Sequence, residues 1–289
     1  GNVNYNPATS VIQPLLVNKA NQTITFNPLP NKNFGNSPFT LNATSSSNLS
    51  VSYTSSNTSV ATISGNTVTI VGAGTTNITA SQAGNGNYNP ATSVIQPLLV
   101  EKANQTITFN SLPNKTFGDA PFALSATGGV SGNPVTFSSS NTSVATISGN
   151  TVTIVGAGAT NITASQVGNG NYNPASDVIQ SLVVNKASQT ITFNPLPNKV
   201  FGDTPFALSA TGGASGNPVT FSSSNTSVAT ISGNTVIIVG AGTTNITASQ
   251  AGNDNYNPTD IIQPLVVNKA NQTITFEVIP AKTFSGTPE

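Results

Sequence analysis

The sequence repeats itself at a fixed spacing. A Lys-Ala pair followed by Gln-Thr-Ile-Thr-Phe recurs with its Ala at positions 20, 103, 187 and 270, so successive copies are 83 or 84 residues apart. Such self-similarity indicates a series of equivalent structural units. We predict three complete repeats, flanked by the C-terminal strand of a preceding repeat and by the start of a following one. These segments are residues 21–103, 104–187 and 188–270, with 1–20 and 271–289 at the ends. We expect the array, and any export or anchoring signal, to continue beyond this sequence.

Within a repeat, apolar residues alternate with Ser and Thr at a period of two, which is typical of half-buried strands. The pair Gly149-Asn150 predicts a two-residue hairpin of the primed-turn type. Phe122, Leu124 and Ala126 should share one face of their strand. In the second repeat we expect seven strands, around 105–109, 122–126, 135–137, 145–147, 152–154, 162–164 and 178–184.

Seven short strands in about 84 residues, with no amphipathic helix, favour a two-sheet antiparallel sandwich over a barrel. A solenoid is disfavoured because its period would be about 20 to 45 residues. Proline cannot donate to a ladder, so Pro14, Pro97 and Pro264 predict that the last strand lies at a sheet edge. The fold class predicted is therefore all-β, with tandem sandwiches.

The composition excludes most chemistry. His, Cys, Met and Trp are absent and the formal net charge is zero. Without His there is no side chain that titrates near neutral pH, and without Cys or His the usual zinc, copper and haem sites cannot form. The neutral charge disfavours nucleic acid and anionic membranes as partners, and no apolar run is long enough to insert into a membrane. We predict no enzyme, and no catalytic, cofactor-binding or metal-binding residues.

One run carries a family resemblance. Residues 139–152, followed by Gly156-Ala157-Gly158 and Ile162-Thr163-Ala164, resemble the group 2 bacterial immunoglobulin-like domains, and the pattern recurs over 55–80 and 223–248. The remainder of each repeat resembles long tandem repeats in secreted and surface proteins of the Bacteroidota. The resemblance implies a seven-stranded immunoglobulin-like sandwich, display on the bacterial surface, and a spacer role in large adhesins used for attachment or gliding. It implies no catalytic residues.

Calcium between repeats is one alternative, because several acidic residues lie in or beside loops. The first repeat argues against it, since Asn36 and Ser93 stand where the second repeat has Asp119 and Asp177, and its one acid is Glu101. A role for Asp in turns is the favoured interpretation, and the cofactor prediction is none. The acids considered are Asp119, Asp177, Asp203, Asp254 and Asp260.

Every repeat has Lys at two recurring positions, which are Lys115 and Lys186 in the second repeat. Such a lysine could form an intramolecular covalent bond with Asn or Asp, given a nearby buried carboxylate. The scarcity of acids argues against this, and we interpret both as solvated residues near strand ends that discourage aggregation. Asn141 and Asn161 begin Asn-x-Ser/Thr sequences. Such sequences arise by chance in so Asn- and Thr-rich a chain.

The loop 168–174, Gly-Asn-Gly-Asn-Tyr-Asn-Pro, combines an aromatic ring with amides that could bind a sugar. We instead expect Tyr172 to pack its ring on the end of its own domain while its hydroxyl finds a partner, with Gly and Asn supplying positive-φ turns.

The joint Val184–Gln189 contains neither Gly nor Pro, so we expect a short, extended linker and a semi-rigid rod. Each repeat should add roughly 35 to 45 Å, so three would span about 100 to 130 Å. The predicted function is an extracellular stalk or spacer of a bacterial cell-surface adhesin, whose partners are neighbouring repeats of the same chain. The alternatives are a self-assembling filament or surface-layer subunit, which would bind other copies of itself, and a polysaccharide-binding module.

Overall fold

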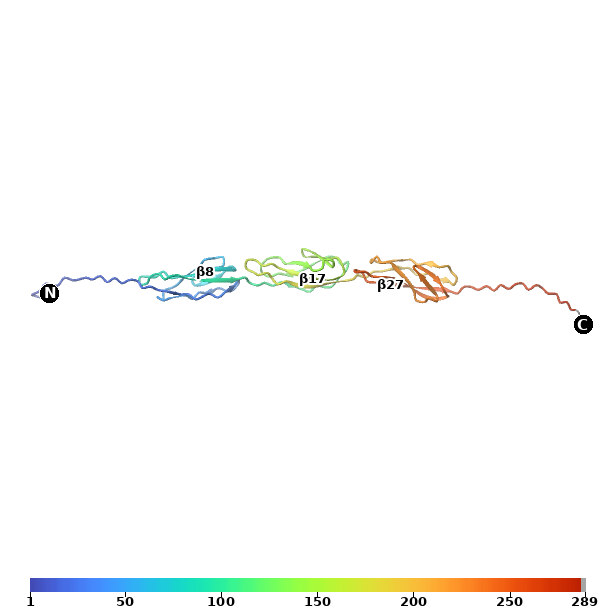
Figure 1. Cartoon of the computed structure of the whole chain (residues 1–289), viewed down its shortest axis with the longest axis horizontal. Helices are drawn as coiled ribbons and strands as arrows, with labels where there is room; N and C mark the ends of the chain where they lie inside the picture. The colour runs from blue at the N-terminus through green and yellow to red at the C-terminus, as the bar shows by residue number, and fades with distance from the viewer. Residues whose placement is uncertain (287–289) are drawn as a thin grey trace. The chain divides into compact units, whose positions relative to one another are not determined.

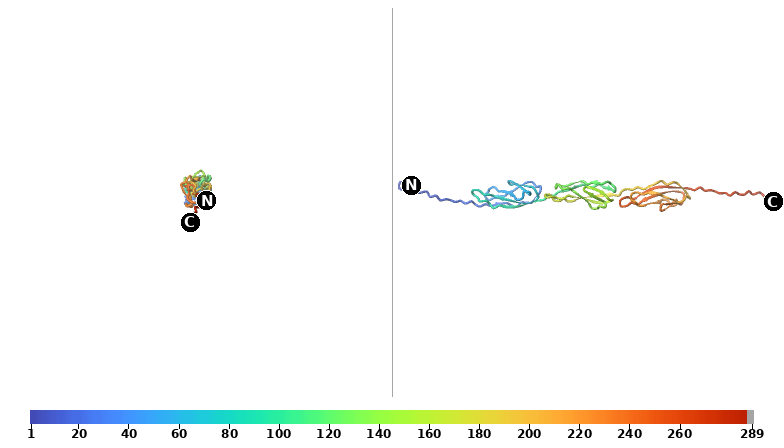
Figure 2. Two further views of the ribbon diagram at one scale, coloured as in Figure 1. Left: turned by 90° about the vertical axis from the view of Figure 1, so that its right-hand side faces the viewer. Right: turned by 90° about the horizontal axis from the view of Figure 1, so that it is seen from above.

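The computed structural model describes residues 1–286, and in this part of the chain it forms strands β1 to β27 and no helix. The ribbon views show strands joined by turns and loops within the repeats, and segments without strands at both ends of the chain (Figures 1 and 2). No helix that could cross a membrane occurs among these residues. The all-β prediction is confirmed.

Each repeat contains nine strand segments in the same order. The first repeat has β1 (Ile24–Thr25), β2 (Lys32–Asn33), β3 (Phe39–Thr40), β4 (Thr44–Ser45), β5 (Ser52–Ser55), β6 (Ala61–Ser64), β7 (Thr67–Ile70), β8 (Gly74–Ser81) and β9 (Val94–Glu101). The second has β10 (Thr108–Phe109), β11 (Lys115–Thr116), β12 (Phe122–Ala123), β13 (Ala126–Thr127), β14 (Thr136–Ser139), β15 (Ala145–Ser148), β16 (Thr151–Ile154), β17 (Gly158–Ser165) and β18 (Val178–Asn185). The third has β19 (Thr192–Phe193), β20 (Lys199–Val200), β21 (Phe206–Ala207), β22 (Ala210–Thr211), β23 (Val219–Ser223), β24 (Ala229–Ser232), β25 (Thr235–Ile238), β26 (Gly242–Gln250) and β27 (Thr259–Asn268).

The strands of a repeat form two main sheets and one short pair. In the first repeat the sheets have the orders β2-β9-β8-β5 and β3-β7-β6, and β1 pairs with β4. The equivalent strands have the same orders in the second and third repeats. β2 and its counterparts pair in parallel with β9 and its counterparts. The other strand pairings of the first and third repeats are antiparallel. The sheets therefore form the predicted sandwich, with one parallel contact that the sequence pattern did not predict.

The central hairpins follow directly from local sequence. Ser148 pairs with Thr151 across Gly149-Asn150, and Gly149 has a φ of 61°, the conformation that the first position of a primed turn requires. Burial follows the alternation, because Phe122, Leu124 and Ala126 are each more buried than Ala123 and Ser125. The predicted hairpin and the shared face are confirmed.

The prediction of seven continuous strands was wrong for the first two. The expected strand 105–109 keeps only β10, and a further strand, β11, follows it in a different sheet. The expected strand 122–126 is divided between β12 and β13, which also belong to different sheets. In both regions the chain passes from one sheet to another, which interrupts the hydrogen bonds between strands. Alternate side chains continue to point inward, so the period of two persists in the sequence.

The last strand was predicted to lie at a sheet edge. This prediction is confirmed at its proline and is wrong at its C-terminal end. Pro97 pairs with Asn77 of β8, and no strand flanks it on the other side. Farther along, Val100 and Glu101 pair with Lys32 and Asn33 of β2. Pro264 and Val267 of β27 show the same contrast. The proline therefore lies where β9 has no partner strand on its outer side. The C-terminal end of β9 is covered by β2.

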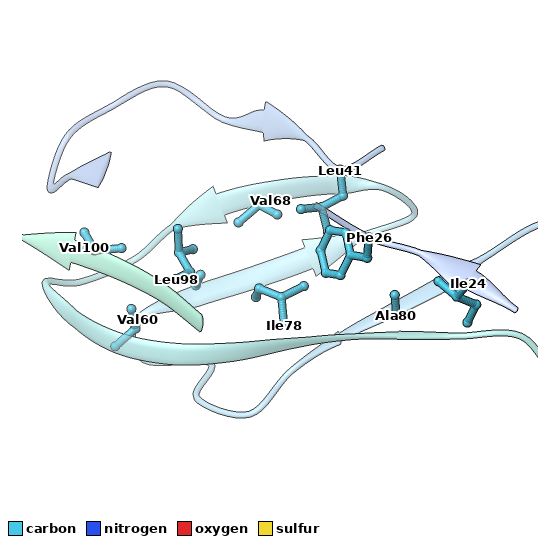
Figure 3. Packing of buried hydrophobic residues seen from close by; sticks show 10 residues of the cluster. Ile24, Phe26, Leu41, Val60, Val68, Ile78, Ala80, Leu98 and Val100 are labelled. Atoms are coloured by element: carbon cyan, nitrogen blue, oxygen red, sulfur yellow. The ribbon is translucent and has the colours of Figure 1, made fainter. Parts of the chain in front are cut away.

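The core of the first repeat lies between its sheets (Figure 3). Leu98 and Ile78 are fully buried at its centre, and Phe26 and Leu41 fill the end nearest β1. The third repeat buries the equivalent residues, and the equivalent positions of the second are buried as well. The first-repeat cluster is Ile24, Phe26, Leu41, Val60, Ala61, Val68, Ile78, Ala80, Leu98 and Val100.

The chain divides into two compact units, and the division passes through the second repeat. One unit holds residues 1–110, 125–138 and 163–180, and the other holds the remainder. The repeat boundaries therefore stay a prediction from the sequence, although β1–β9 and β19–β27 lie inside 21–103 and 188–270. Residues 7–19, predicted as a last strand, form no strand, and Val11, Ile12 and Leu15 are 80% or more exposed. Residues 271–286 form no strand either, and 287–289 of that predicted segment lie outside the described residues.

Candidate functional site: the joints between repeats

The linker between the first two repeats is bound to a loop of the second. The N–H of Ala103 donates to the carbonyl oxygen of Asn171 (2.9 Å), and the N–H of Asn173 donates to the carbonyl oxygen of Ala103 (2.9 Å). Together they form a parallel bridge between Ala103 and Tyr172. All these residues belong to the same compact unit. The linker is therefore extended and hydrogen-bonded.

We call residues 168–174 the joint loop, together with their counterparts 84–90 and 252–258. Its shape is set by Asn169, whose Oδ1 accepts the N–H groups of Asn171 (2.8 Å) and Tyr172 (3.0 Å). Gly168 is required for space, because a Cβ there would lie 2.2 Å from the carbonyl oxygen of Tyr172. The predicted positive φ occurs at Gly84 (77°) but at neither glycine of 168–174, so that prediction was wrong for the second repeat.

The joint loop also contacts the preceding repeat. The Oδ1 atom of Asn171 accepts the N–H of Ala73 (2.9 Å), which lies in the Gly-Ala-Gly turn before β8. The Tyr172 ring packs against the Phe34 ring, edge to face, with the centroids 5.3 Å apart. Such aromatic pairs stabilise by about 0.5–1.5 kcal/mol beyond the area that they bury. The ring of Tyr172 was predicted to pack on its own domain, and it reaches the neighbouring one instead.

A lysine of the linker completes the joint. The ammonium group of Lys102 donates to the carbonyl oxygen of Asn169 (2.7 Å). The amide of Asn173 donates to the Oδ1 of Asn104 (2.9 Å), so both sides of Ala103 are tied to the joint loop. A charge-assisted bond to a backbone oxygen is stronger than a neutral one, and it fixes the loop where the linker passes.

The joint between the second and third repeats is built in the same way. The Oδ1 of Asn255 accepts the N–H of Ala157 (2.8 Å), and the rings of Tyr256 and Phe117 pack edge to face with centroids 5.5 Å apart. The ammonium group of Lys186 donates to the carbonyl oxygen of Asn253 (2.7 Å). This joint lies wholly within the second compact unit. The contacts are therefore specified by residues that every repeat carries.

The end of the third repeat shows the surface that a joint loop covers. Phe201, the counterpart of Phe34 and Phe117, is 49% exposed, whereas those two are half-buried. It borders a hollow of about 870 Å³ that Gly240, Ala241, Lys269 and Ala270 also line. Gly240 is required by packing within its own repeat, since a Cβ would lie 2.7 Å from the carbonyl oxygen of Ser227. We call this surface the acceptor surface.

Comparisons with known proteins do not assign this chain to a family. No family model matches the chain, and no curated protein matches it. Repeats EC1-4 of Drosophila N-cadherin are 12% identical, with a TM-score of 0.30, over 88% of this chain and 76% of that one. Domains 1-6 of the surface layer protein SbsC are 18% identical, with a TM-score of 0.26, over 88% and 41%. The human desmocollin-1 ectodomain is 8% identical, with a TM-score of 0.29, over 86% and 61%. The chain thus spans less than half of the solved surface-layer protein, and the resemblance to group 2 bacterial domains stays a prediction.

Two of the candidate calcium ligands have roles in turns. The Oδ2 of Asp119 accepts the N–H of Thr116 (2.9 Å), and Asp203 accepts the N–H of Val200 in the same way (2.9 Å). In the first repeat the Oδ1 of Asn36 accepts the N–H of Asn33 (2.9 Å). An amide oxygen serves as well as a carboxylate for this bond, which explains the exchange of Asp for Asn. The turn interpretation is confirmed at these positions.

The structure does not bring the other acids together. Within residues 1–286, no three of Asp and Glu lie close enough to hold a metal ion. Asp177 follows a loop, and Asp254 belongs to the joint loop of the third repeat, beside Asn255. Asp260 lies on β27 and pairs with Ser249 of β26. Their positions provide no shared coordination sphere.

The candidate lysines have two different environments. Lys115 is half-buried, and its ammonium nitrogen lies 4.6 Å from the centroid of the Phe122 ring. The equivalent pairs in the other repeats are 4.6 Å and 4.5 Å apart. The prediction of a solvated lysine was therefore wrong for Lys115, because its charge is held over an aromatic face. Lys186 is exposed as expected, and it takes part in the second joint.

Of the two Asn-x-Ser/Thr positions named above, Asn141 has its side chain engaged. The Oδ1 of Asn141 accepts both the N–H (3.1 Å) and the hydroxyl (2.6 Å) of Ser143, in the same Asn-x-Ser sequence. Asn161 is exposed on β17. The local turn explains why this Asn recurs in each repeat.

Proposed function

We propose that this chain is a non-enzymatic spacer segment of an extracellular bacterial adhesin or filament, in which the repeats hold a distal binding region away from the cell. The single observation that carries the proposal is that both joints use the same contacts, which join the joint loop of one repeat to the acceptor surface of the one before. A spacer requires a reproducible joint more than a unique site in any copy.

The chemistry of the joint suits this function. Its contacts come from the linker itself, from an amide on a backbone N–H and from a pair of rings, so bending at the joint would break several of them together. A flexible tether would instead contain Gly and Ser and make no such contacts. The repeats are therefore proposed to act as a semi-rigid rod.

The bacterial and surface-exposed parts of the proposal rest on the sequence. They are supported by the resemblance of residues 139–164 to group 2 bacterial immunoglobulin-like domains. The proposal that the chain is no enzyme is supported by the complete lack of His and Cys. Polysaccharide binding by the joint loop is disfavoured, because Asn169, Asn171 and Asn173 already use their amides in the joint.

The test is small-angle X-ray scattering on the 289-residue chain, with calcium and with chelator. Three repeats in a semi-rigid rod should give a maximum dimension above roughly 100 Å in both conditions. A compact particle, or one that extends only when calcium is added, would contradict the spacer proposal.

A further inference from the structure

The second and last strand segments of each repeat are parallel neighbours. Lys32 and Asn33 of β2 pair with Val100 and Glu101 of β9, and the N–H of Phe34 donates to the carbonyl oxygen of Glu101 (2.8 Å). In the third repeat β20 pairs with β27 in the same register, and the N–H of Phe201 donates to Asn268 (2.9 Å). In the first repeat only β1, with its short pairing to β4, precedes β2 along the chain, and the chain leaves the repeat through β9.

A glutamine side chain makes a second link between the same two parts. The Nε2 of Gln96 on β9 donates to the carbonyl oxygen of Phe26, which follows β1 (2.7 Å). The equivalent bonds join Gln180 to Phe109 (2.7 Å) and Gln263 to Phe193 (2.8 Å). We call this bond and the parallel pair the terminal clamp.

Tension along the chain would act on the terminal clamp in shear. It would pull the entry segment toward its own N-terminus and the last strand toward its C-terminus. Because β2 and β9 run in the same direction, the two strands would have to slide past one another, and their hydrogen bonds would be strained together. A terminal hairpin pulled at its open end would instead lose its bonds one at a time.

We propose that each repeat resists tensile force, and that the terminal clamp is the element that does so. This inference deepens the proposed spacer function, on which its biological use rests, since a stalk that holds a bound tip transmits tension. The hairpins between β3 and β8 lie outside the direct path between entry and exit.

The inward face of β9 in the terminal clamp is buried. Leu98 and Val100 of β9 are 0% and 1% exposed, and Phe26 beside the glutamine bond is 7% exposed. Pro28 and Pro30 restrict the segment between β1 and β2 to extended conformations, which leaves it little slack. Force on the linker should therefore pass through the short β1–β4 pair and then load the terminal clamp.

The experiment is single-molecule unfolding of the full chain at constant force, pulled through its two ends. The chain has no cysteine, so handles can be attached at single introduced cysteines. Rupture of one clamp releases residues 34–100, a gain in contour length on the order of 220–240 Å before the folded length is subtracted. The variant Gln180→Leu/Gln263→Leu removes the side-chain bond in two repeats and leaves the first unchanged. We expect two of the three steps to occur about 5 to 10 times faster than in the unaltered chain.

A matched control removes a buried glutamine bond elsewhere. Gln166 and Gln250 accept the N–H groups of Gly129 (2.7 Å) and Gly213 (2.6 Å), and neither residue bonds the entry segment. Gln166→Leu/Gln250→Leu should lower resistance to urea while the unfolding rate under force stays unchanged. The proposal is overturned if the clamp variant unfolds under force at the unaltered rate, or if the control variant is accelerated equally.

A second measurement keeps the proposal testable should the clamp variant fail to fold. Handles at Thr230→Cys and Ile237→Cys, which pair across β24 and β25, would open that hairpin from its end in the otherwise unaltered chain. Opening should need less force than pulling through the chain ends, and equal forces would overturn the proposal. Small-angle scattering tests whether the chain is extended, as the spacer proposal requires. The unfolding rates and forces test whether the terminal clamp resists tension, so the two proposals can fail separately.

Discussion

At the scale of single residues, the joint loop depends on small side chains in two different ways. Gly168 is needed because its neighbour's backbone lies where a Cβ would be, whereas a Cβ at Gly170 would meet nothing within 4 Å. The same contrast exists between Gly84 and Gly86. The close approach of the Tyr172 backbone therefore explains why residue 168 is glycine, and no such contact explains Gly170.

Gly168→Ala should destabilise the second repeat by about 1–3 kcal/mol, because the new methyl group must displace the backbone of Tyr172 and Asn173. Gly170→Ala is the matched control and should change stability by no more than about 0.5 kcal/mol. Hydrogen exchange measured by mass spectrometry can follow peptides of this repeat separately. Equal protection in the two variants would show that the loop accommodates a Cβ at either position.

At the scale of the element, local pattern predicted the hairpins and the last strand, β18, but it did not predict the short strand β11 that pairs with β18. Ser148 to Thr151 carries both the alternation and the turn residue, so the pairing of β15 with β16 follows from neighbouring residues. The parallel pairing of Lys115 with Val184 joins residues far apart in the sequence, and no alternation marks so short a strand. Strand β11 was missed for this reason.

The joints were beyond local pattern as well. The sequence singled out Tyr172 and its amides, but its partner Phe34 belongs to another repeat, and no spacing rule connects them. One signal could have indicated the contact: the turn residues Phe-Gly, Gly-Ala-Gly and Asn-Tyr are kept in every copy, although nothing within one repeat needs all of them. Invariance among copies at the turns of a repeat is a sign of contact between copies.

The last strand of the first repeat offers a direct test of alternation. Leu98 is fully buried, and the adjacent Leu99 is 38% exposed. Leu98→Ala should cost about 2–5 kcal/mol through lost burial and the cavity left behind, and Leu99→Ala should cost much less. Urea denaturation, with exchange in first-repeat peptides as the readout, would measure both. Similar losses would mean that β9 does not present one face to the core.

At the scale of the whole molecule, the joints determine what the repeats can do together. Their contacts use amides, a lysine and aromatic rings, and no carboxylate of the described residues bridges a joint. A chain joined in this way should not need a divalent cation to order its repeats.

The melting temperature of the chain should therefore be the same, within about 1 °C, in millimolar calcium and in chelator, because a ligand stabilises a protein only when it binds the folded state. Differential scanning calorimetry would measure it, with magnesium as a control for ionic strength. A rise with calcium alone would place a cation site in the folded chain.

Removing the joint contacts should loosen the array without unfolding it. Asn171→Ala/Tyr172→Ala removes the bond to Ala73 and the ring pair with Phe34, both of which lie at the repeat surface. Labels at Thr54→Cys and Ser138→Cys, exposed equivalent positions on β5 and β14, would report the distance between the first two repeats by double electron-electron resonance. We expect the distance distribution to become at least about twofold broader, since restraint falls to the linker alone.

The matched control is Asn87→Ala/Tyr88→Ala. It makes the same change in the joint loop of the first repeat. In this sequence only residues 1–20 precede that repeat, so its joint loop has no complete repeat to contact. That variant should leave the distribution between the labels unchanged, because neither residue lies at the labelled joint. If both variants broaden it equally, the effect comes from a weakened repeat. If neither does, the linker and its lysine orient the repeats by themselves, and the amide and ring contacts are not needed for the proposed rod.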